Sequence, residues 1–119
     1  MPRFLVVDDD PDVRELVELA LDGQGYDVTS VSGGQAALEQ LTWGPYDLIV
    51  CDLHMPGVDG PAVYRAVQMP RTAVLFFSGY YDASPYEGSL RETRAPALGK
   101  PFDINTLRQM GRRLLEERA

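Results

Sequence analysis

Three residue types that often carry chemistry or crosslinks are scarce in this sequence. Its 119 residues include one cysteine, one histidine and one lysine. The single Cys51 has no partner for an internal disulfide, and because it lies in an apolar run we expect a small buried hydrophobic residue. A chain without disulfides suits a reducing compartment, so a cytoplasmic location is expected.

Long apolar runs are missing as well. No run approaches the length that spans a bilayer, and the apolar segment 4–7 is followed at once by three acids, which is unlike a signal peptide. The 18 acidic and 11 basic residues give a net charge of −7, whereas nucleic-acid binding needs a basic surface. We therefore expect no direct contact with membranes or nucleic acids.

The pattern that is present is an alternation of apolar strands and amphipathic helices over residues 1–119. The length fits one domain, with no linker, repeat or output domain. The expected strands are residues 4–7, 26–31, 48–51, 73–77 and 95–99, with 26–31 at or near a sheet edge. Helices are expected between Asp10 and Gly23, from a capping box at Ser32 and Gln35 to Gly44, between Asp59 and Pro70, within 80–94, and after Asp103. Five strand–helix units predict an α/β fold with a doubly wound parallel sheet and helices on both faces.

Polar residues follow the predicted strands at the point where each strand ends. They are Asp8, Asp9, Asp52, Ser78 and Lys100. Because parallel strands end at the same edge of a sheet, we expect these side chains to gather there. Three neighbouring carboxylates need a cation or a proton, and Mg²⁺ suits an oxygen-rich site of this kind.

These residues predict phosphoryl transfer to an aspartate. A carboxylate is an established nucleophile for forming an aspartyl phosphate. The Ser78 hydroxyl, the Gly79 amide and the Lys100 ammonium offer donors to a phosphoryl group, and phosphoryl transfer requires mainly positioning and charge stabilisation.

The chain resembles response-regulator receiver domains from end to end. The matching segments, in family order and spacing, are Val6 to Pro11, Asp52 to Pro56 with Asp59-Gly60, Ser78-Gly79, and Lys100-Pro101-Phe102. The resemblance implies a (βα)5 fold with five parallel strands in the order 2-1-3-4-5.

The resemblance also implies a role for each matched residue. Asp52 is the expected phosphoacceptor. Mg²⁺, or Mn²⁺ in its place, is expected on Asp8, Asp9, Asp52 and the backbone carbonyl of His54, with Asp9 binding it directly and Asp8 through a water. The phosphoryl group is expected to be bound by Ser78, Lys100 and the backbone amides of His54 and Gly79.

The same resemblance implies a signalling switch that catalyses only its own phosphorylation and dephosphorylation. The expected partners are a sensor histidine kinase or a histidine phosphotransfer protein, and a downstream protein of unknown identity. The chain is expected to be a monomer or a phosphorylation-dependent dimer.

One position departs from the family pattern, and another lies where the family varies the lifetime of the phosphoryl group. Ala97 stands three residues before Lys100, where receivers usually carry the aromatic residue of the activation switch. Tyr80, Tyr81 and Tyr86 are candidates to replace that aromatic residue. Tyr80 also lies two residues after Ser78, where the family tunes the lifetime of the phosphoryl group, and its ring is expected to slow hydrolysis.

Simpler interpretations apply to several residues. Asp10, Asp59 and Asp103 each precede a helix and are expected to be caps, and the imidazole of His54 is not expected to bind metal. Trp43 is expected to pack at the edge of the core or against a loop.

Other functions remain as alternatives. The main one is a pseudo-receiver, a protein-interaction module that does not use phosphate, which Ala97 favours and the intact acidic set disfavours. A flavodoxin-like flavin protein is disfavoured because three acids after the first strand would repel a cofactor phosphate. An aspartate-nucleophile phosphatase is disfavoured because His54 stands where a second acid is needed.

Overall fold

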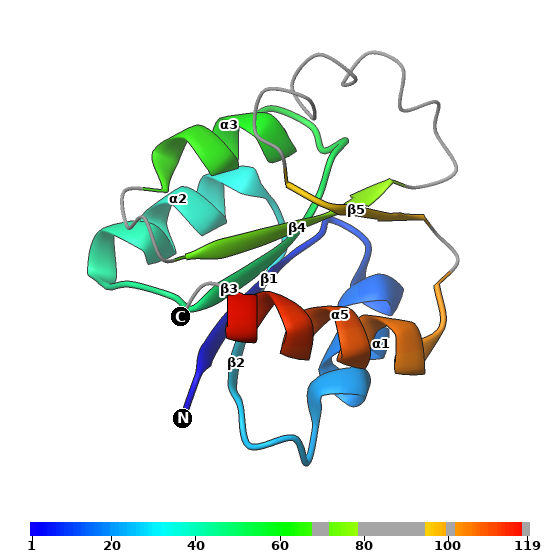
Figure 1. Ribbon diagram of the computed structural model, residues 1–119. Helices are drawn as coiled ribbons and strands as arrows, with labels where there is room; N and C mark the ends of the chain where they lie inside the picture. The colour runs from blue at the N-terminus through cyan, green and yellow to red at the C-terminus, as the bar shows by residue number, and fades with distance from the viewer. Residues whose placement is uncertain (68–71, 79–94, 100–101, 118–119) are drawn as a thin grey trace.

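The computed structural model describes residues 1–67, 72–78, 95–99 and 102–117. Its five strands form one parallel sheet, whose arrangement is seen in Figure 1. The strand order is β2-β1-β3-β4-β5, which confirms the predicted fold and the edge position of β2. The strands are β1 (Arg3–Val7), β2 (Asp27–Val31), β3 (Leu48–Asp52), β4 (Ala73–Ser78) and β5 (Ala97–Gly99). The helix expected within 80–94 lies outside the described residues.

Helices cover both faces of the sheet. On one face lie α1 (Pro11–Leu21) and α5 (Ile104–Glu117), and on the other lie α2 (Gly34–Trp43) and α3 (Gly60–Ala66) (Figure 1). No helix in the described ranges is long and apolar enough to cross a membrane.

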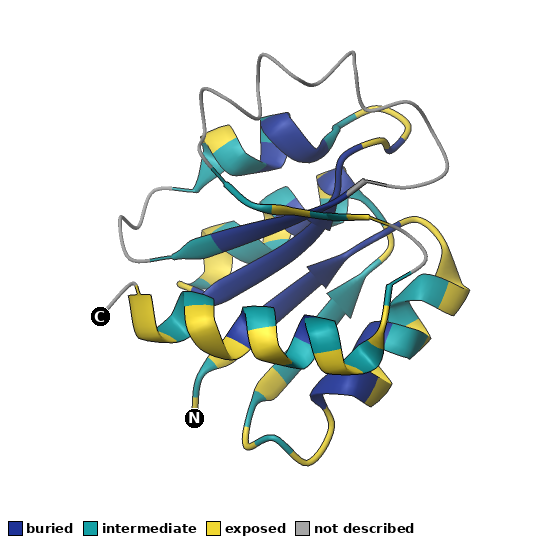
Figure 2. Cartoon of the chain, turned by 45° about the vertical axis from the view of Figure 1, so that its right-hand side comes forward, coloured by how far each residue is buried: buried dark blue, intermediate teal, exposed yellow. Residues whose placement is uncertain are grey.

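The central strands are buried because both of their faces are covered. All five residues of β3 are buried, and in β1 Leu5 and Val7 contact the α2–α3 side while Phe4 and Val6 contact the α1–α5 side. Figure 2 shows this buried centre, with the helices exposed only on their outer sides. A run of apolar residues that does not alternate with polar ones is therefore the expected pattern for such strands.

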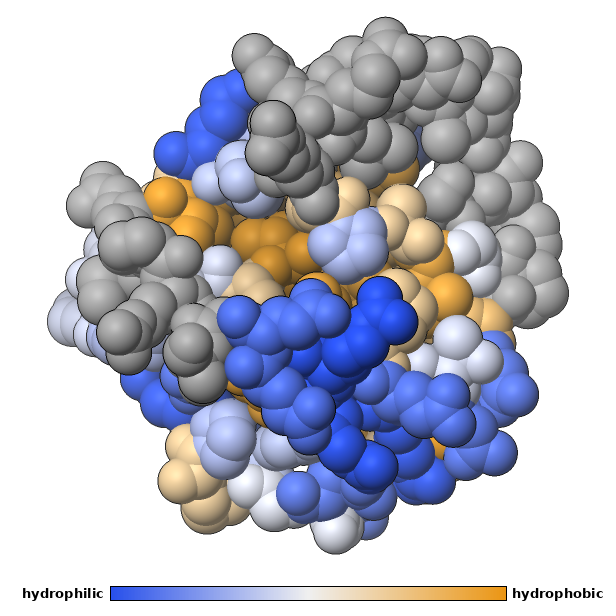
Figure 3. Space-filling model, in the orientation of Figure 1, coloured by the Kyte–Doolittle hydropathy of each residue, from blue (hydrophilic) through white to orange (hydrophobic). Residues whose placement is uncertain are grey.

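The outer side of α5 is polar. Its exposed residues include Arg112, Arg113 and Glu116, and Figure 3 shows this hydrophilic surface with apolar side chains of the sheet layer beside it. On its inner side, Leu107 and Gly111 are buried. The amphipathic pattern predicted for this helix is thus confirmed.

Aspartates cap three helices, as predicted. The Asp10 side chain accepts a hydrogen bond from the Asp12 amide, Asp59 accepts one from the Ala62 amide, and Asp103 accepts one from the Asn105 amide. Each satisfies a backbone N–H that the first helical turn leaves without a partner.

Two sequence expectations were wrong. The capping box at Ser32 and Gln35 does not form, because α2 begins at Gly34 and Gly33 takes the cap position without a side-chain hydrogen bond. Trp43 does not pack at the core edge: it is 84% exposed. It is the last residue of α2, and with Leu38, Leu41, Tyr46 and Val67 it lines a groove of about 620 Å³.

Candidate functional site

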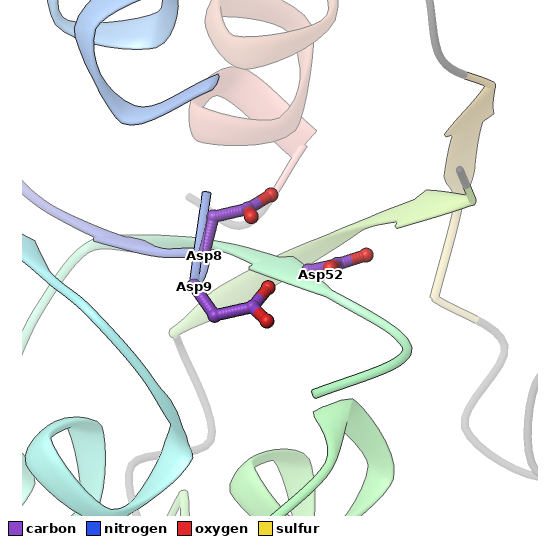
Figure 4. A group of neighbouring side chains, drawn as sticks. All are labelled: Asp8, Asp9 and Asp52. Atoms are coloured by element: carbon purple, nitrogen blue, oxygen red, sulfur yellow. The ribbon is translucent and has the colours of Figure 1, made fainter. Parts of the chain in front are cut away.

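The predicted acidic cluster forms at the carboxyl-terminal edge of the sheet. Val7 of β1 lies beside Cys51 of β3 in the parallel register, so Asp8 and Asp52 come next to each other. Carboxylate oxygens of Asp8, Asp9 and Asp52 all lie within 4.8 Å of one another. Figure 4 shows the three carboxylates side by side and pointing to the same side of the sheet.

Burial makes this cluster a strong candidate for a cation. Asp8 is fully buried and Asp52 is 5% exposed, whereas Asp9 is exposed. Buried carboxylates that face one another repel, and a divalent cation removes that repulsion. Mg²⁺ prefers a few carboxylate ligands and keeps several waters, which fits two buried oxygen ligands with an exposed third. The donor set therefore fits the metal that the sequence predicted.

Backbone hydrogen bonds hold the turn between β1 and α1 that carries Asp8 and Asp9. The Asp8 amide donates to the Val31 carbonyl at 3.3 Å, and the Asp10 amide donates to the Asp8 carboxylate at 2.9 Å. The Asp8 carbonyl accepts a 2.7 Å hydrogen bond from the Arg14 guanidinium. The turn is thus tied to β2 on one side and to α1 on the other.

The segment after Asp52 is held equally closely. The Leu53 amide donates to the Phe77 carbonyl, and the Gly60 amide donates to the Leu53 carbonyl, both at 3.0 Å. A Cβ on Gly60 would lie 2.7 Å from the Asp52 carbonyl oxygen, so only glycine allows this approach. Gly57 has φ +77°, a left-handed conformation that lets the chain turn between β3 and α3.

Cys51 precedes Asp52 and is buried, as predicted. Burial raises the pKa of the Cys51 thiol, and the negative charges of Asp52, Asp8 and Asp59 raise it further. The thiol donates a hydrogen bond to the Asp52 carbonyl at 3.3 Å. Cys51 is therefore a protonated core residue next to the site.

The remaining predicted site residues are placed only in part. Ser78 ends β4 and pairs in register with Gly99 of β5, and Lys100 comes directly after Gly99. Gly79, Tyr80 and Lys100 lie outside the described residues, so the phosphoryl-binding set stays a prediction.

Two other predicted positions lie in described segments. His54 is exposed in the segment after β3, and its backbone roles also stay predictions. Ala97 is exposed on β5 and pairs in register with Phe76, which packs beside Tyr64.

Sequence reasoning missed Arg14, and it quoted Gly60 in a matching segment without giving it a role. Arg14 contacts the acidic turn, and Gly60 allows the close approach to Asp52. A signal for Arg14 existed: a basic residue near the start of a helix is unfavourable for the helix dipole, so it suggests a specific partner.

Known proteins share this fold and sequence pattern. Residues 4–112 match the sequence model of the response regulator receiver domain. The chain is 33% identical to the response regulator receiver protein CpdR of Brucella abortus, over 90% of this chain and 91% of CpdR. Its structure is similar to that of the chemotaxis protein CheY4 of Vibrio cholerae, with a TM-score of 0.83 and 28% identity over 96% of this chain and 98% of CheY4.

Longer regulators contain a similar segment. The DNA-binding transcriptional regulator NtrC of Klebsiella pneumoniae is 31% identical over 84% of this chain, but the match covers only 22% of NtrC. The match to the response regulator protein PilR of Pseudomonas aeruginosa covers 25% of PilR. The family match, the fold and the acidic cluster agree, and this chain belongs to the response regulator receiver domain family, whose members are signalling switches of two-component systems.

Proposed function

We propose that Asp52 is the phosphoacceptor and receives its phosphoryl group from a phosphohistidine of a sensor kinase or a histidine phosphotransfer protein. The observation that carries this proposal is the position of the Asp52 carboxylate: it ends a fully buried central strand, within 4.8 Å of the Asp8 and Asp9 carboxylates. Ligand sites of open α/β sheets lie at this edge of the sheet.

The proposed reaction is a single displacement at phosphorus. A carboxylate oxygen of Asp52 attacks the phosphorus atom, and the P–N bond to the donor imidazole breaks. The bonding electron pair goes to the imidazole nitrogen, and the ring leaves neutral if its other nitrogen keeps its proton. The product is an acyl phosphate on Asp52.

Asp8, Asp9 and Asp52 would hold Mg²⁺, or Mn²⁺, together with the His54 carbonyl. Bound metal neutralises part of the charge that builds up between the carboxylates and the phosphoryl oxygens. The hydrogen bonds that fix the β1–α1 turn support this role, because they keep Asp8 and Asp9 beside Asp52 before any ligand arrives.

The phosphoryl oxygens would be bound from the neighbouring strands. We assign this role to the Ser78 hydroxyl, the Lys100 ammonium and the backbone amides of His54 and Gly79. The order β3-β4-β5 supports the assignment, since β4, which Ser78 ends, and β5, which precedes Lys100 in the sequence, both lie on the same side of β3.

Phosphorylation would then change the affinity for a downstream protein, in a monomer or a phosphorylation-dependent dimer. The DNA-binding role in the name of NtrC belongs to that longer protein. The acidic chain described here is proposed to act through protein contacts in the cytoplasm, a reducing compartment suited to its unpaired Cys51.

The test is intact-mass analysis after incubation with acetyl phosphate and Mg²⁺. We expect one phosphoryl adduct on the wild-type chain, and none on Asp52→Asn or after metal chelation. Asp59→Asn is the matched control: it removes an acid from the same segment, keeps a side chain able to cap α3, and should still be phosphorylated. Mg²⁺ binding without any adduct would favour the pseudo-receiver.

A further inference from the structure

Two hydrogen bonds join Arg14 to the acidic turn, and the first of them depends on the arginine side chain. The Arg14 guanidinium Nη1 donates to the Asp8 carbonyl oxygen at 2.7 Å, and its backbone amide donates to the Asp10 carbonyl oxygen at 3.1 Å. Asp9, the exposed carboxylate of the cluster, lies between these two anchored carbonyl groups. Arg14 is partly buried, so its guanidinium has exchanged part of its water for this contact.

The carbonyl that Arg14 binds belongs to Asp8, whose carboxylate lies close to the carboxylates of Asp9 and Asp52. Like charges on Asp8, Asp9 and Asp52 repel one another, which favours movement of the turn away from β3, and a hydrogen bond to the backbone of the turn opposes that movement. A hydrogen bond from a charged donor is about twice as strong as a neutral one. The Arg14 contact ends on the carbonyl and not on a carboxylate, so it fixes the backbone without occupying a metal-ligand oxygen.

We propose that Arg14 is a positioning residue for the metal site, which keeps the Asp8 and Asp9 carboxylates in place for a divalent cation. This inference rests on the proposed function, because it assigns Arg14 a part in the Mg²⁺ binding proposed above. It makes Mg²⁺ affinity depend on a side chain that does not touch the metal, as outer-shell residues do at other metal sites.

A simple charge effect predicts the opposite sign. Arg14 brings a positive charge to a cation site, so its removal would strengthen Mg²⁺ binding if charge alone mattered. If positioning dominates, its removal weakens binding. The direction of the change therefore separates the charge effect from the positioning effect.

The experiment is calorimetric titration of Mg²⁺ into the unphosphorylated chain, with wild type compared with Arg14→Met and Arg14→Lys. We expect Arg14→Met to raise the dissociation constant by about tenfold or more, the usual size of an outer-shell effect. Arg14→Lys keeps the charge and one donor, and should recover part of the lost affinity. It also keeps the comparison possible if Arg14→Met does not fold.

Arg108 supplies the matched control. Its Nε donates to the Ala20 carbonyl at 2.6 Å, so it makes the same kind of contact with α1, but near the other end of that helix. Arg108→Met should lower the urea midpoint of unfolding as Arg14→Met does, while its Mg²⁺ affinity stays at the wild-type value.

Three results would overturn the inference. They are unchanged or tighter Mg²⁺ binding by Arg14→Met, an equal loss of affinity in Arg108→Met, and no recovery in Arg14→Lys. If the wild-type chain itself bound no Mg²⁺, the proposed metal site would fail together with this inference. If the wild-type chain binds Mg²⁺ and Arg14→Met binds it with the same affinity, only the role of Arg14 is refuted and the proposed metal site stands.

Discussion

Gly34, the first residue of α2, lies directly against Val58 in the segment between β3 and α3. A Cβ built on Gly34 would overlap the Val58 carbonyl oxygen and lie 2.6 Å from the Val58 Cβ. The start of α2 and the segment that follows Asp52 are therefore in closer contact than any residue other than glycine permits.

We predict that Gly34→Ala destabilises the chain. The added methyl group must displace backbone as well as side-chain atoms of Val58, and overpacking of this kind costs about 1–3 kcal/mol. Urea unfolding measures the loss. Gly33→Ala is the control, because a Cβ there meets no atom within 4 Å and its φ of 177° is an ordinary extended conformation. Equal stability of the two variants would contradict the prediction.

Gly111→Ala should have the opposite effect. Gly111 lies inside α5, where a Cβ would contact Phe4 and Leu48 at ordinary distances of 3.6–3.9 Å. Alanine has a lower conformational cost than glycine in a helix, so we expect a gain of about 0.5–1 kcal/mol in the free energy of unfolding. The urea midpoint should rise without a change in the slope of the transition. A lower midpoint would show that the site has no room for the methyl group.

Neutralising Asp9 should change thermal stability and Mg²⁺ affinity in opposite directions. Asp9→Asn removes one of three repelling charges, so the metal-free chain should unfold at a higher temperature. The same change removes a proposed ligand and should weaken Mg²⁺ binding at least about tenfold, a loss of about 1.4 kcal/mol. Thermal unfolding in chelator, followed by Mg²⁺ titration, measures both.

The control for this variant is Asp10→Asn, which removes the adjacent charge while Asn still caps α1. It should retain most of the Mg²⁺ affinity. A fall in the metal-free unfolding temperature of Asp9→Asn would argue that the carboxylates do not repel one another.

Cys51 should make stability fall at high pH. Burial raises the pKa of the thiol in the folded chain, whereas in the unfolded chain it ionises near its ordinary pKa of about 8.5. Because the folded-state pKa is the higher one, the protonated thiol contributes fully to the free energy of unfolding below a pH of about 8.5. This contribution declines as the pH rises, by up to about 1.4 kcal/mol per pH unit.

Comparison with Cys51→Ala isolates that contribution. The difference in unfolding free energy between wild type and Cys51→Ala should be constant from pH 7 to 8 and shrink by up to about 2 kcal/mol by pH 10. Parallel curves over the whole range would mean that the thiol ionises equally in both states. Thiol reagents provide a second check, because the buried thiol should react only through unfolding.

Tyr80 should prolong the lifetime of the phosphoryl group. This prediction comes from the position of Tyr80 two residues after Ser78, because Tyr80 is outside the described residues. Tyr80→Ala should lose the phosphoryl group faster than wild type, since a smaller side chain screens the acyl phosphate less well from water. Tyr80→Phe, which keeps the ring, is the control. Identical decay of the phosphorylated mass in wild type and Tyr80→Ala would refute the prediction.

Much of the fold could be predicted because the central strands are buried on both faces. A short apolar run such as Leu48 to Cys51 that is followed by an acid and a Pro-Gly turn is typical of a buried strand, and the acid marks the strand end. Parallel strands predicted that Asp8 and Asp52 lie at one edge of the sheet, and the strand order that makes β1 and β3 neighbours was implied by the family resemblance.

The details that were wrong or missed depend on tertiary packing. The helix α2 begins at Gly34, which packs against Val58, and not after the local capping signal at Ser32. The bond from Arg14 to the Asp8 carbonyl depends on the path of the turn, which no residue pattern specifies. In α2, Trp43 does not fall on the same helical face as Ala37 and Leu41, and it is exposed. The helical periodicity alone therefore predicts an outward side chain, whereas the large apolar ring suggested a packed one.

The exposed Trp43 determines what optical measurements on this chain can report. It is the only tryptophan, and it lies at the end of α2, before β3 begins, whereas the carboxylates lie where β3 ends. Because Trp43 is exposed, its emission in the folded chain should be that of a hydrated indole, and metal or phosphate at Asp52 should leave the spectrum unchanged. A blue shift of the emission on mixing with another protein would instead indicate that the partner contacts the chain near the end of α2, away from the carboxylates.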